Sequence, residues 1–117
     1  MQDTIGVEKV KYNNKDITVI DMLTITDIKA AVSQIAPQYP IRQIHLFGSY
    51  AEGNAKQNSD IDILVEFGKR PVTLLDFCGF QQELSEFLNV GVDIVKSPLS
   101  ESTRKDMKIN RVVHLYG

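Results

Sequence analysis

A strand, a short helix and a second strand are expected within residues 46–65, which read LFGSYAEGNAKQNSDIDILV. The first strand spans 42–47 and the second spans 60–67, each rich in apolar and β-branched side chains. Gly48-Ser49 ends the first strand, and ten residues then separate Ser49 from Asp60. That gap fits one short helix and a turn, so we expect Gly48-Ser49 and Asp60 to meet at the same end of one sheet.

Two carboxylates share one face of the second strand. Because side chains alternate along a strand, Asp60 and Asp62 point the same way, with Cα atoms roughly 6.5 to 7 Å apart. Asp93 lies in a third expected strand, 92–96, and joins them if that strand lies beside the second. Carboxylates this close share a proton or bind a cation, and oxygen ligands suit Mg²⁺. Two alternatives stay open: Asp60 caps a turn, and Asp93 is an edge-strand charge that faces water.

Gly48-Ser49 is expected to bind phosphate. Backbone N–H groups at the start of a helix lack helical partners, and glycine lets a ligand approach the main chain. On its own this pair would be an ordinary turn at a strand end. Together with the acids, it gives the layout for nucleotidyl transfer, in which a metal polarises the α-phosphate.

The rest of the chain predicts a mixed α/β domain. A Thr-x-x-Asp helix start at Thr24 opens one helix, and Pro37 ends it. A last helix is expected from Ser100 to about Asn110, and the apolar tail 112–116 is expected to dock on the body. Another helix, 73–88, is expected to bury Leu74, Phe77, Cys78, Leu84, Phe87 and Leu88.

The first 22 residues are expected to form a separate feature. Segments 7–12 and 17–22 are two β-prone runs around a polar turn, and they predict a β-hairpin. We therefore divide the chain into an N-terminal hairpin extension, 1–22, and one domain, 23–117.

Composition narrows the function classes. The 117 residues carry 13 basic and 15 acidic side chains, and a net charge of −2 predicts no direct binding of duplex nucleic acid. One cysteine cannot form an internal disulfide, and no run approaches the ~18 to 20 apolar residues of a membrane span. The sequence start also lacks the pattern of a signal peptide, so we expect a cytoplasmic protein without membrane contact.

Three segments resemble a known family: LFGSYAEG at 46–53, SDIDILV at 59–65 and VDIV at 92–95. They are similar to the minimal nucleotidyltransferases of the DNA polymerase β-like superfamily, and the resemblance runs from about residue 23 to 116. A bare Asp-x-Asp would be a weak signal, whereas five placed residues in a strand–helix–strand context are specific. The resemblance implies a polymerase β-like fold, a small mixed sheet with helices packed on it.

The resemblance also implies an activity and a partner. Members are commonly antitoxins paired with a helical HEPN ribonuclease toxin, and characterised ones transfer AMP from ATP to a toxin tyrosine. By this resemblance Asp60 and Asp62 bind two Mg²⁺ ions, and Asp93 completes the site and assists deprotonation of the acceptor. Gly48 and Ser49 hold the triphosphate, and Ser59 fixes the turn or touches phosphate.

One departure from the family pattern concerns charge. Where the family usually reads Gly-Ser-Arg-Ala-Arg-Gly, this chain has Tyr50 and Glu52, and Tyr50 is expected at the rim of the site or on the surface. Two readings follow: an active adenylyltransferase, or an antitoxin of the same fold that neutralises its partner by binding alone. A third, nucleotidylation of a small molecule, is weakened because 117 residues leave no room for a substrate domain.

Two other features have less specific readings. His45 is expected to be a satisfied strand histidine rather than a metal ligand, because no second His or Cys stands at metal spacing. The basic run from Arg104 to Lys108 reads as a solvated helix face or as a surface that meets an acidic partner.

Overall fold

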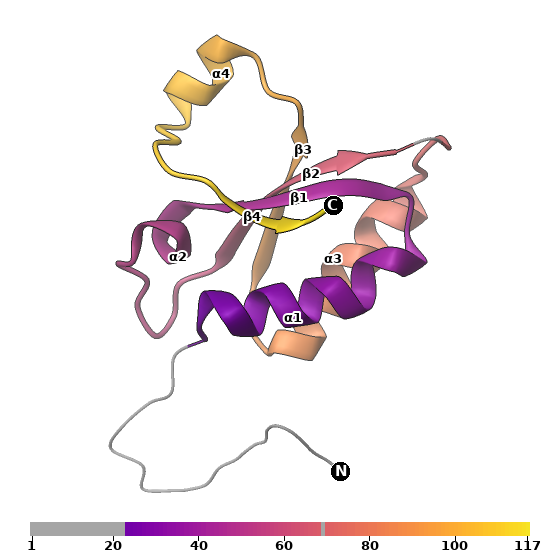
Figure 1. Cartoon of the computed structure of the whole chain (residues 1–117), viewed down its shortest axis with the longest axis horizontal. Coiled ribbons are helices and arrows are strands. Elements are labelled where there is room, and N and C mark those ends of the chain that lie inside the picture. Colours follow the sequence, from indigo (N-terminus) through magenta and orange to yellow (C-terminus); the bar gives the residue numbers. More distant parts are fainter. Residues whose placement is uncertain (1–22, 69) are drawn as a thin grey trace, which may run out of the picture.

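The computed structural model describes residues 23–68 and 70–117, which fold around one four-stranded sheet (Figure 1). In chain order the elements are α1 (Ile25–Ile35), a 3₁₀ turn η1 (Ala36–Gln38), β1 (Ile41–Phe47), α2 (Gly48–Glu52), β2 (Ile61–Phe67), α3 (Leu74–Leu88), β3 (Val92–Ser97), α4 (Glu101–Asp106) and β4 (Val113–Tyr116). The strand order in the sheet is β3-β2-β1-β4. Antiparallel pairing joins β1 to both β2 and β4, whereas β2 and β3 run parallel. The mixed α/β prediction is therefore confirmed.

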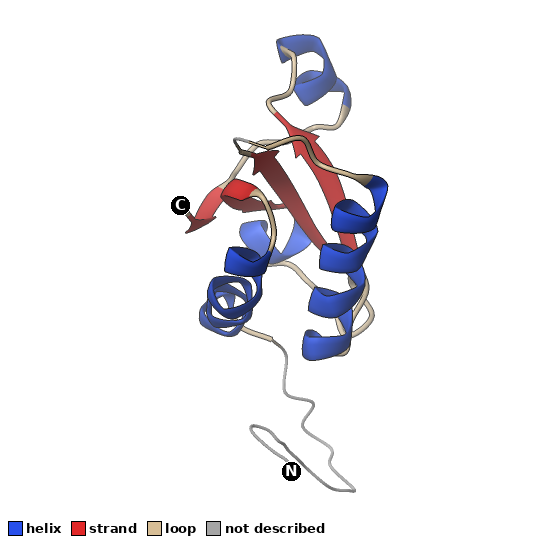
Figure 2. Ribbon diagram, turned by 90° about the vertical axis from the view of Figure 1, so that its right-hand side faces the viewer, coloured by secondary structure: helices blue, strands red, loops and turns tan. Residues whose placement is uncertain are grey.

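Helices α1 and α3 cover one face of the sheet, and the two views show them side by side (Figure 2). The sheet residues buried beneath them alternate along the strands, as expected for a sheet with one covered face. The fully buried side chains include Ile44 and Leu46 from β1, Ile61, Ile63 and Val65 from β2, and Phe80 and Leu84 from α3. Residues of opposite alternation, Asp62 among them, therefore lie on the face turned away from α1 and α3.

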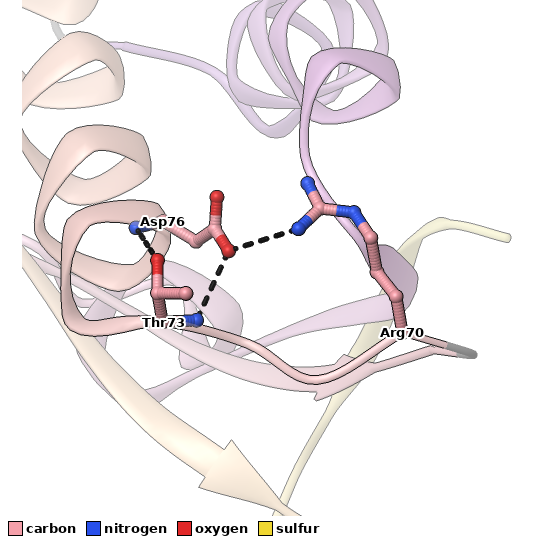
Figure 3. Close-up of polar contacts among 3 residues, drawn as sticks. All are labelled: Arg70, Thr73 and Asp76. Atoms are coloured by element: carbon pink, nitrogen blue, oxygen red, sulfur yellow. Dashed lines mark hydrogen bonds and ion pairs between the residues drawn. The ribbon is translucent and has the colours of Figure 1, made fainter.

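Both long helices begin with the same capping arrangement. Thr24 accepts a hydrogen bond from the Asp27 backbone N–H, and the Asp27 side chain accepts one from the Thr24 N–H. Thr73 and Asp76 repeat this at α3, where Arg70 also donates to Asp76 at 3.2 Å (Figure 3). The hydrogen bond from the Thr73 backbone N–H and the contact with Arg70 lower the pKa of Asp76, because they favour its charged form. Helix starts are thus fixed locally, as the Thr-x-x-Asp pattern indicates.

The C-terminal tail docks on the body, as expected. It does so as strand β4, which pairs with the last residues of β1 and contributes the buried Leu115. The last helix is shorter than expected: it ends at Asp106 and not near Asn110. Lys108 adopts a left-handed conformation with φ of 56°, which ends helical hydrogen bonding.

The expected buried face of 73–88 is partly wrong. Cys78 is exposed, Phe87 is 54% exposed, and Leu74, the first residue of α3, is 77% exposed. Phe80 and Leu84 face the sheet, and Cys78, two residues from Phe80, points about 200° away from it around the helix. The periodicity of apolar residues in 73–88 is compatible with burial of either of two helix faces, and the face that packs against the sheet is the one that carries Phe80 and Leu84.

No helix in the described part of the chain is long and apolar enough to cross a membrane. The expected hairpin at 7–22 lies outside the described residues.

Candidate active site

Three neighbouring strands bring two of the predicted acids into one row. Phe47 of β1 pairs with Asp62 of β2, and Asp62 pairs in turn with Asp93 of β3. Paired residues of adjacent strands point to the same side of a sheet, so both carboxylates lie on the face opposite α1 and α3. Asp60 directly precedes β2 and, by alternation, belongs to the same side. The third predicted strand does lie beside the second, and Asp60, Asp62 and Asp93 share one end of the sheet.

Asp62 is the most enclosed of the three acids. Its side chain is partly buried, whereas Asp60 and Asp93 are exposed. Burial raises the pKa of Asp62, and the negative charges of Asp93 and Asp60 raise it further. Asp93 is also an edge-strand residue that faces water, so the alternative reading of its environment is correct as well.

Gly48 and Gly91 leave the space that two of the carboxylates occupy. Gly48 has a φ of 75°, and a Cβ atom added there would collide with the Asp62 carboxylate, 3.1 Å from its Cγ. A Cβ atom at Gly91 would collide with the Asp60 carboxylate, 3.0 Å from its Cγ. The carbonyl oxygen of Gly91 also accepts a 2.8 Å hydrogen bond from the N–H of Ile61, which fixes its distance from β2. Any side chain at either glycine would displace a carboxylate.

The contribution of Gly91 was not predicted from the sequence. Asn89 and Gly91 both read as the end of the preceding helix, yet Asn89 alone takes the left-handed C-cap, with φ of 56°. The available signal was a glycine two residues before Asp93 that is not needed to cap the helix.

The short helix α2 brings Gly48-Ser49 beside the acids. It is one short helix, as expected, and it ends because Gly53 takes the left-handed C-cap with φ of 79°. Ser59 closes the following turn: its hydroxyl accepts a 2.7 Å hydrogen bond from the N–H of Lys56, and its own N–H donates to the Lys56 carbonyl. Of the two roles considered for Ser59, fixing the turn is the one its contacts support.

Tyr50 differs from its expected place. It was expected at the rim or on the surface, but α2 packs Tyr50 and Ala51 into the core. Burial raises the pKa of Tyr50, and the charge of Asp60 raises it further, so the phenol stays neutral near the acids. Glu52, on the other side of the helix, is exposed.

The donor set suits a hard cation that brings other ligands with it. No group of three or more His, Cys, Asp or Glu side chains within the described ranges is arranged to hold a metal ion unaided. Mg²⁺ is usually bound by one or two protein carboxylates and completes its shell with water and substrate phosphates. A partly buried Asp62 between two acids and beside a glycine that carries no side chain fits this mode of binding.

Two histidines lie on the same sheet face as the acids. His45 pairs with His114 across β1 and β4, and their rings meet edge to face with centroids 5.3 Å apart. Nε2 of His114 lies 2.6 Å from the carbonyl oxygen of Gly117. Burial lowers the pKa of His45, and His114 and Arg104 lower it further, which favours the neutral ring. His45 is therefore a packed strand histidine, as expected from the sequence.

Known proteins resemble this chain in sequence and in fold. Residues 25–114 match the nucleotidyltransferase domain family. The protein adenylyltransferase MntA of Thermococcus cleftensis is 35% identical over 99 residues, which cover 80% of this chain and 98% of that protein. A crystal structure of a toxin-antitoxin with AMP-PNP contains a chain that is 25% identical, with a TM-score of 0.61 over 76% of this chain and 73% of that chain.

A further structure shows the same fold at lower identity. That structure is of a tri-AMPylated Shewanella oneidensis HEPN toxin in complex with an MNT antitoxin. It contains a chain that is 20% identical, with a TM-score of 0.57 over 80% of this chain and 73% of that chain. The family match runs from the first residue of α1 to the second residue of β4, and it includes the whole of β1, β2 and β3. The chain therefore belongs to the nucleotidyltransferase domain family and is a nucleotidyltransferase.

Proposed function

We propose that this chain is an antitoxin that transfers AMP from ATP to a tyrosine of a HEPN-type toxin. The observation that carries the proposal is the row formed by Asp62 and Asp93, with Asp60 beside it, next to Gly48 at the end of β1. A relative named as an adenylyltransferase and a structural neighbour that is a toxin-antitoxin with AMP-PNP support it. We expect the reaction in the cytoplasm.

Each site residue has a proposed role. Asp60, Asp62 and Asp93 hold Mg²⁺, of which we expect two ions, while Gly48 and Ser49 bind the triphosphate through main-chain N–H groups. Mg²⁺ held by these carboxylates would withdraw electron density from the α-phosphate and neutralise charge on its oxygens. Ser59 contributes by holding the turn that leads from α2 to Asp60.

The proposed transfer balances as a substitution at phosphorus. The tyrosine oxygen of the acceptor forms a bond to the α-phosphorus of ATP, and the bond from that phosphorus to the bridging oxygen breaks. Pyrophosphate leaves, and Asp93 accepts the phenolic proton. Asp93 is exposed on an edge strand, so a protein acceptor reaches it from solvent without any movement of the sheet.

The alternative is an antitoxin that acts by binding alone. Its support is the acidic Glu52, at a position where related chains usually carry arginine. Because the Glu52 side chain is exposed, water and salt screen its repulsion of a triphosphate, and the site can still accept ATP. We therefore favour catalysis.

A double substitution tests the choice. Asp60→Ala combined with Asp62→Ala should abolish transfer of labelled AMP from ATP to the HEPN-type partner. Glu66→Ala is the matched control, because Glu66 is an acid on the same face of β2 at its far end, paired only loosely with Arg42 at 3.8 Å. Unchanged transfer by the double variant would sink the assignment. Normal protection by a double variant that transfers no AMP would establish the binding-only reading instead.

A further inference from the structure

Helix α4 projects from the domain without packing on it. Figure 1 shows α4 set apart from the sheet and from α1 and α3, on the arm that links β3 to β4. Every residue of α4 is exposed, although Ser100 caps its start by accepting a 3.1 Å hydrogen bond from the N–H of Thr103. Helices this short are marginal in isolation, and most helix stability in proteins comes from packing of one face. An ordered helix with no packed face suggests a surface that a second molecule covers.

A basic groove runs along this helix and the turn after it. Three cations line the groove against one acid, while Ile109 supplies a partly buried apolar wall. Within the described residues the ion pairs join Arg42 to Glu66 and Arg70 to Asp76, and none involves the groove. The groove, called the α4 groove below, is lined by Glu101, Arg104, Lys105, Lys108, Ile109 and Asn110.

The α4 groove lies on the side of the sheet that carries the acids. Figure 1 shows α4 on the other side of the strands from α1 and α3, and the charge of Arg104 contributes to the lowered pKa of His45. His45 pairs with Leu64, two residues from Asp62, and so shares its sheet face. Strand β3 also begins beside the acids, at Asp93, and ends in the loop that leads to α4. Because Asp93 lies at the start of β3 and α4 follows its end, a protein that contacts both Asp93 and α4 extends along β3.

We propose that the α4 groove binds an acidic segment of the protein acceptor and thereby holds that acceptor over the carboxylates. This inference rests on the proposed function, and it explains how the chain would recognise its protein acceptor. Three cations complement an acidic segment, and Ile109 offers it an apolar contact. A nucleic acid fits less well, because Glu101 in the groove and the acids on the same sheet face repel a phosphate backbone.

Charge reversal in the groove gives the primary test. Arg104→Glu should raise KM for the HEPN-type acceptor about tenfold at low ionic strength, with kcat and KM for ATP unchanged. The matched control is Lys29→Glu, which makes the same charge change at an exposed position of α1 and should leave every constant unaltered. Soluble poly-L-glutamate should compete with the acceptor for the wild-type chain and not for Arg104→Glu. An unchanged acceptor KM in Arg104→Glu would overturn the proposal.

Two further measurements separate this proposal from its alternatives. Calorimetric titration of the acceptor reports docking without catalysis, and weaker binding by Arg104→Glu supports the groove even if the wild-type chain transfers no AMP. Fluorescence anisotropy with a short single-stranded RNA tests the other ligand class. The proposal would be refuted if the wild-type chain bound this RNA, Arg104→Glu did not, and the two proteins bound the acceptor with equal affinity. The groove would then be assigned to nucleic acid.

Discussion

Asp62 and Asp93 stand opposite each other in the parallel register of β2 and β3, on the sheet face that the long helices leave uncovered. Burial and the charges of Asp93 and Asp60 raise the pKa of Asp62. The fold thus keeps three like charges close together, although moving them apart would stabilise the folded chain. Such a cost is expected at a site kept for binding and chemistry.

The first prediction is that Asp62→Asn stabilises the chain without metal. A carboxyl group with a raised folded pKa contributes stability below its unfolded pKa, ordinarily 3.8, and that contribution is lost as pH rises through the folded pKa. In a chelator at neutral pH, Asp62→Asn should therefore raise the free energy of unfolding by up to about 1 kcal/mol. Denaturant unfolding at several pH values measures it, and the gain should vanish at acid pH.

When Mg²⁺ and ATP are added, the wild-type chain should become more stable than Asp62→Asn. Ligands that bind only the folded state stabilise it, and Asp62→Asn should lose that gain because a ligand carboxylate is missing. Equal stabilisation of both proteins by Mg²⁺ and ATP would contradict the assignment of Asp62 as a ligand.

The second prediction separates backbone strain from collision at Gly48. Gly48 and Gly53 both have positive φ, but an added Cβ meets the Asp62 carboxylate at Gly48 and nothing within 4 Å at Gly53. Gly53→Ala should cost about 1 kcal/mol of stability from strain and retain transfer activity. Gly48→Ala should cost more and abolish transfer. Thermal unfolding and AMP transfer, measured together, distinguish the effects, and equal activity in the two variants would rule out the proposed displacement of Asp62.

Gly91 provides the third prediction. Gly91→Ala should lower AMP transfer roughly 10- to 100-fold, the usual cost of misplacing a group at a reacting centre, because Cβ displaces the Asp60 carboxylate. Gly68→Ala is the control, since an added Cβ there makes only ordinary contacts, the nearest at 3.6 Å. Full activity of Gly91→Ala would show that the position of Asp60 does not depend on this glycine.

The fourth prediction concerns stability at high pH. Tyr39 donates a 2.7 Å hydrogen bond to Glu83, and this bond, followed by burial and the charge of Glu83, raises the pKa of Tyr39 to about 12. Because the folded pKa is raised, the contribution is complete below pH 10 and is lost as pH rises toward 12. The wild-type chain should lose stability across this window, whereas Tyr39→Phe should cost about 1 kcal/mol at neutral pH and show a flatter profile. Parallel pH profiles for the two proteins would exclude this bond as the cause.

The fifth prediction concerns the thiol of Cys78. Because Cys78 is exposed on α3, one equivalent of a thiol reagent should react with the native chain without slowing AMP transfer. A thiol that reacts only after unfolding would place Cys78 in the core, as the helical pattern first indicated.

Local signals predicted much of this molecule. The Thr-x-x-Asp start of α1, the helix expected at 73–88, the strands on either side of Gly48-Ser49 and the docking of the C-terminal tail all follow from short stretches of chain. Features that depend on contacts distant in sequence did not follow. Cys78 was expected in the core and is exposed, whereas Tyr50 was expected at the surface and is buried. Packing, and not periodicity alone, selects the buried side of a helix.

The candidate site shows the same division. Alternation placed Asp60 and Asp62 on one face, but only the register of β2 and β3 brings Asp93 opposite Asp62. The space that Gly91 leaves for Asp60 depends on the distance between two strands that a long crossover connects. The roles of Asp60, Asp62, Asp93, Gly48, Ser49 and Ser59 in transfer stay predictions.

Intact-mass spectrometry of the HEPN-type partner tests the central claim most directly. After incubation with ATP, Mg²⁺ and the wild-type chain, the partner should gain the mass of one AMP group for each modified tyrosine. The Asp60→Ala and Asp62→Ala double variant should leave its mass unchanged, while Glu66→Ala should behave like the wild-type chain. A partner that the wild-type chain neutralises without any gain in mass would contradict the account.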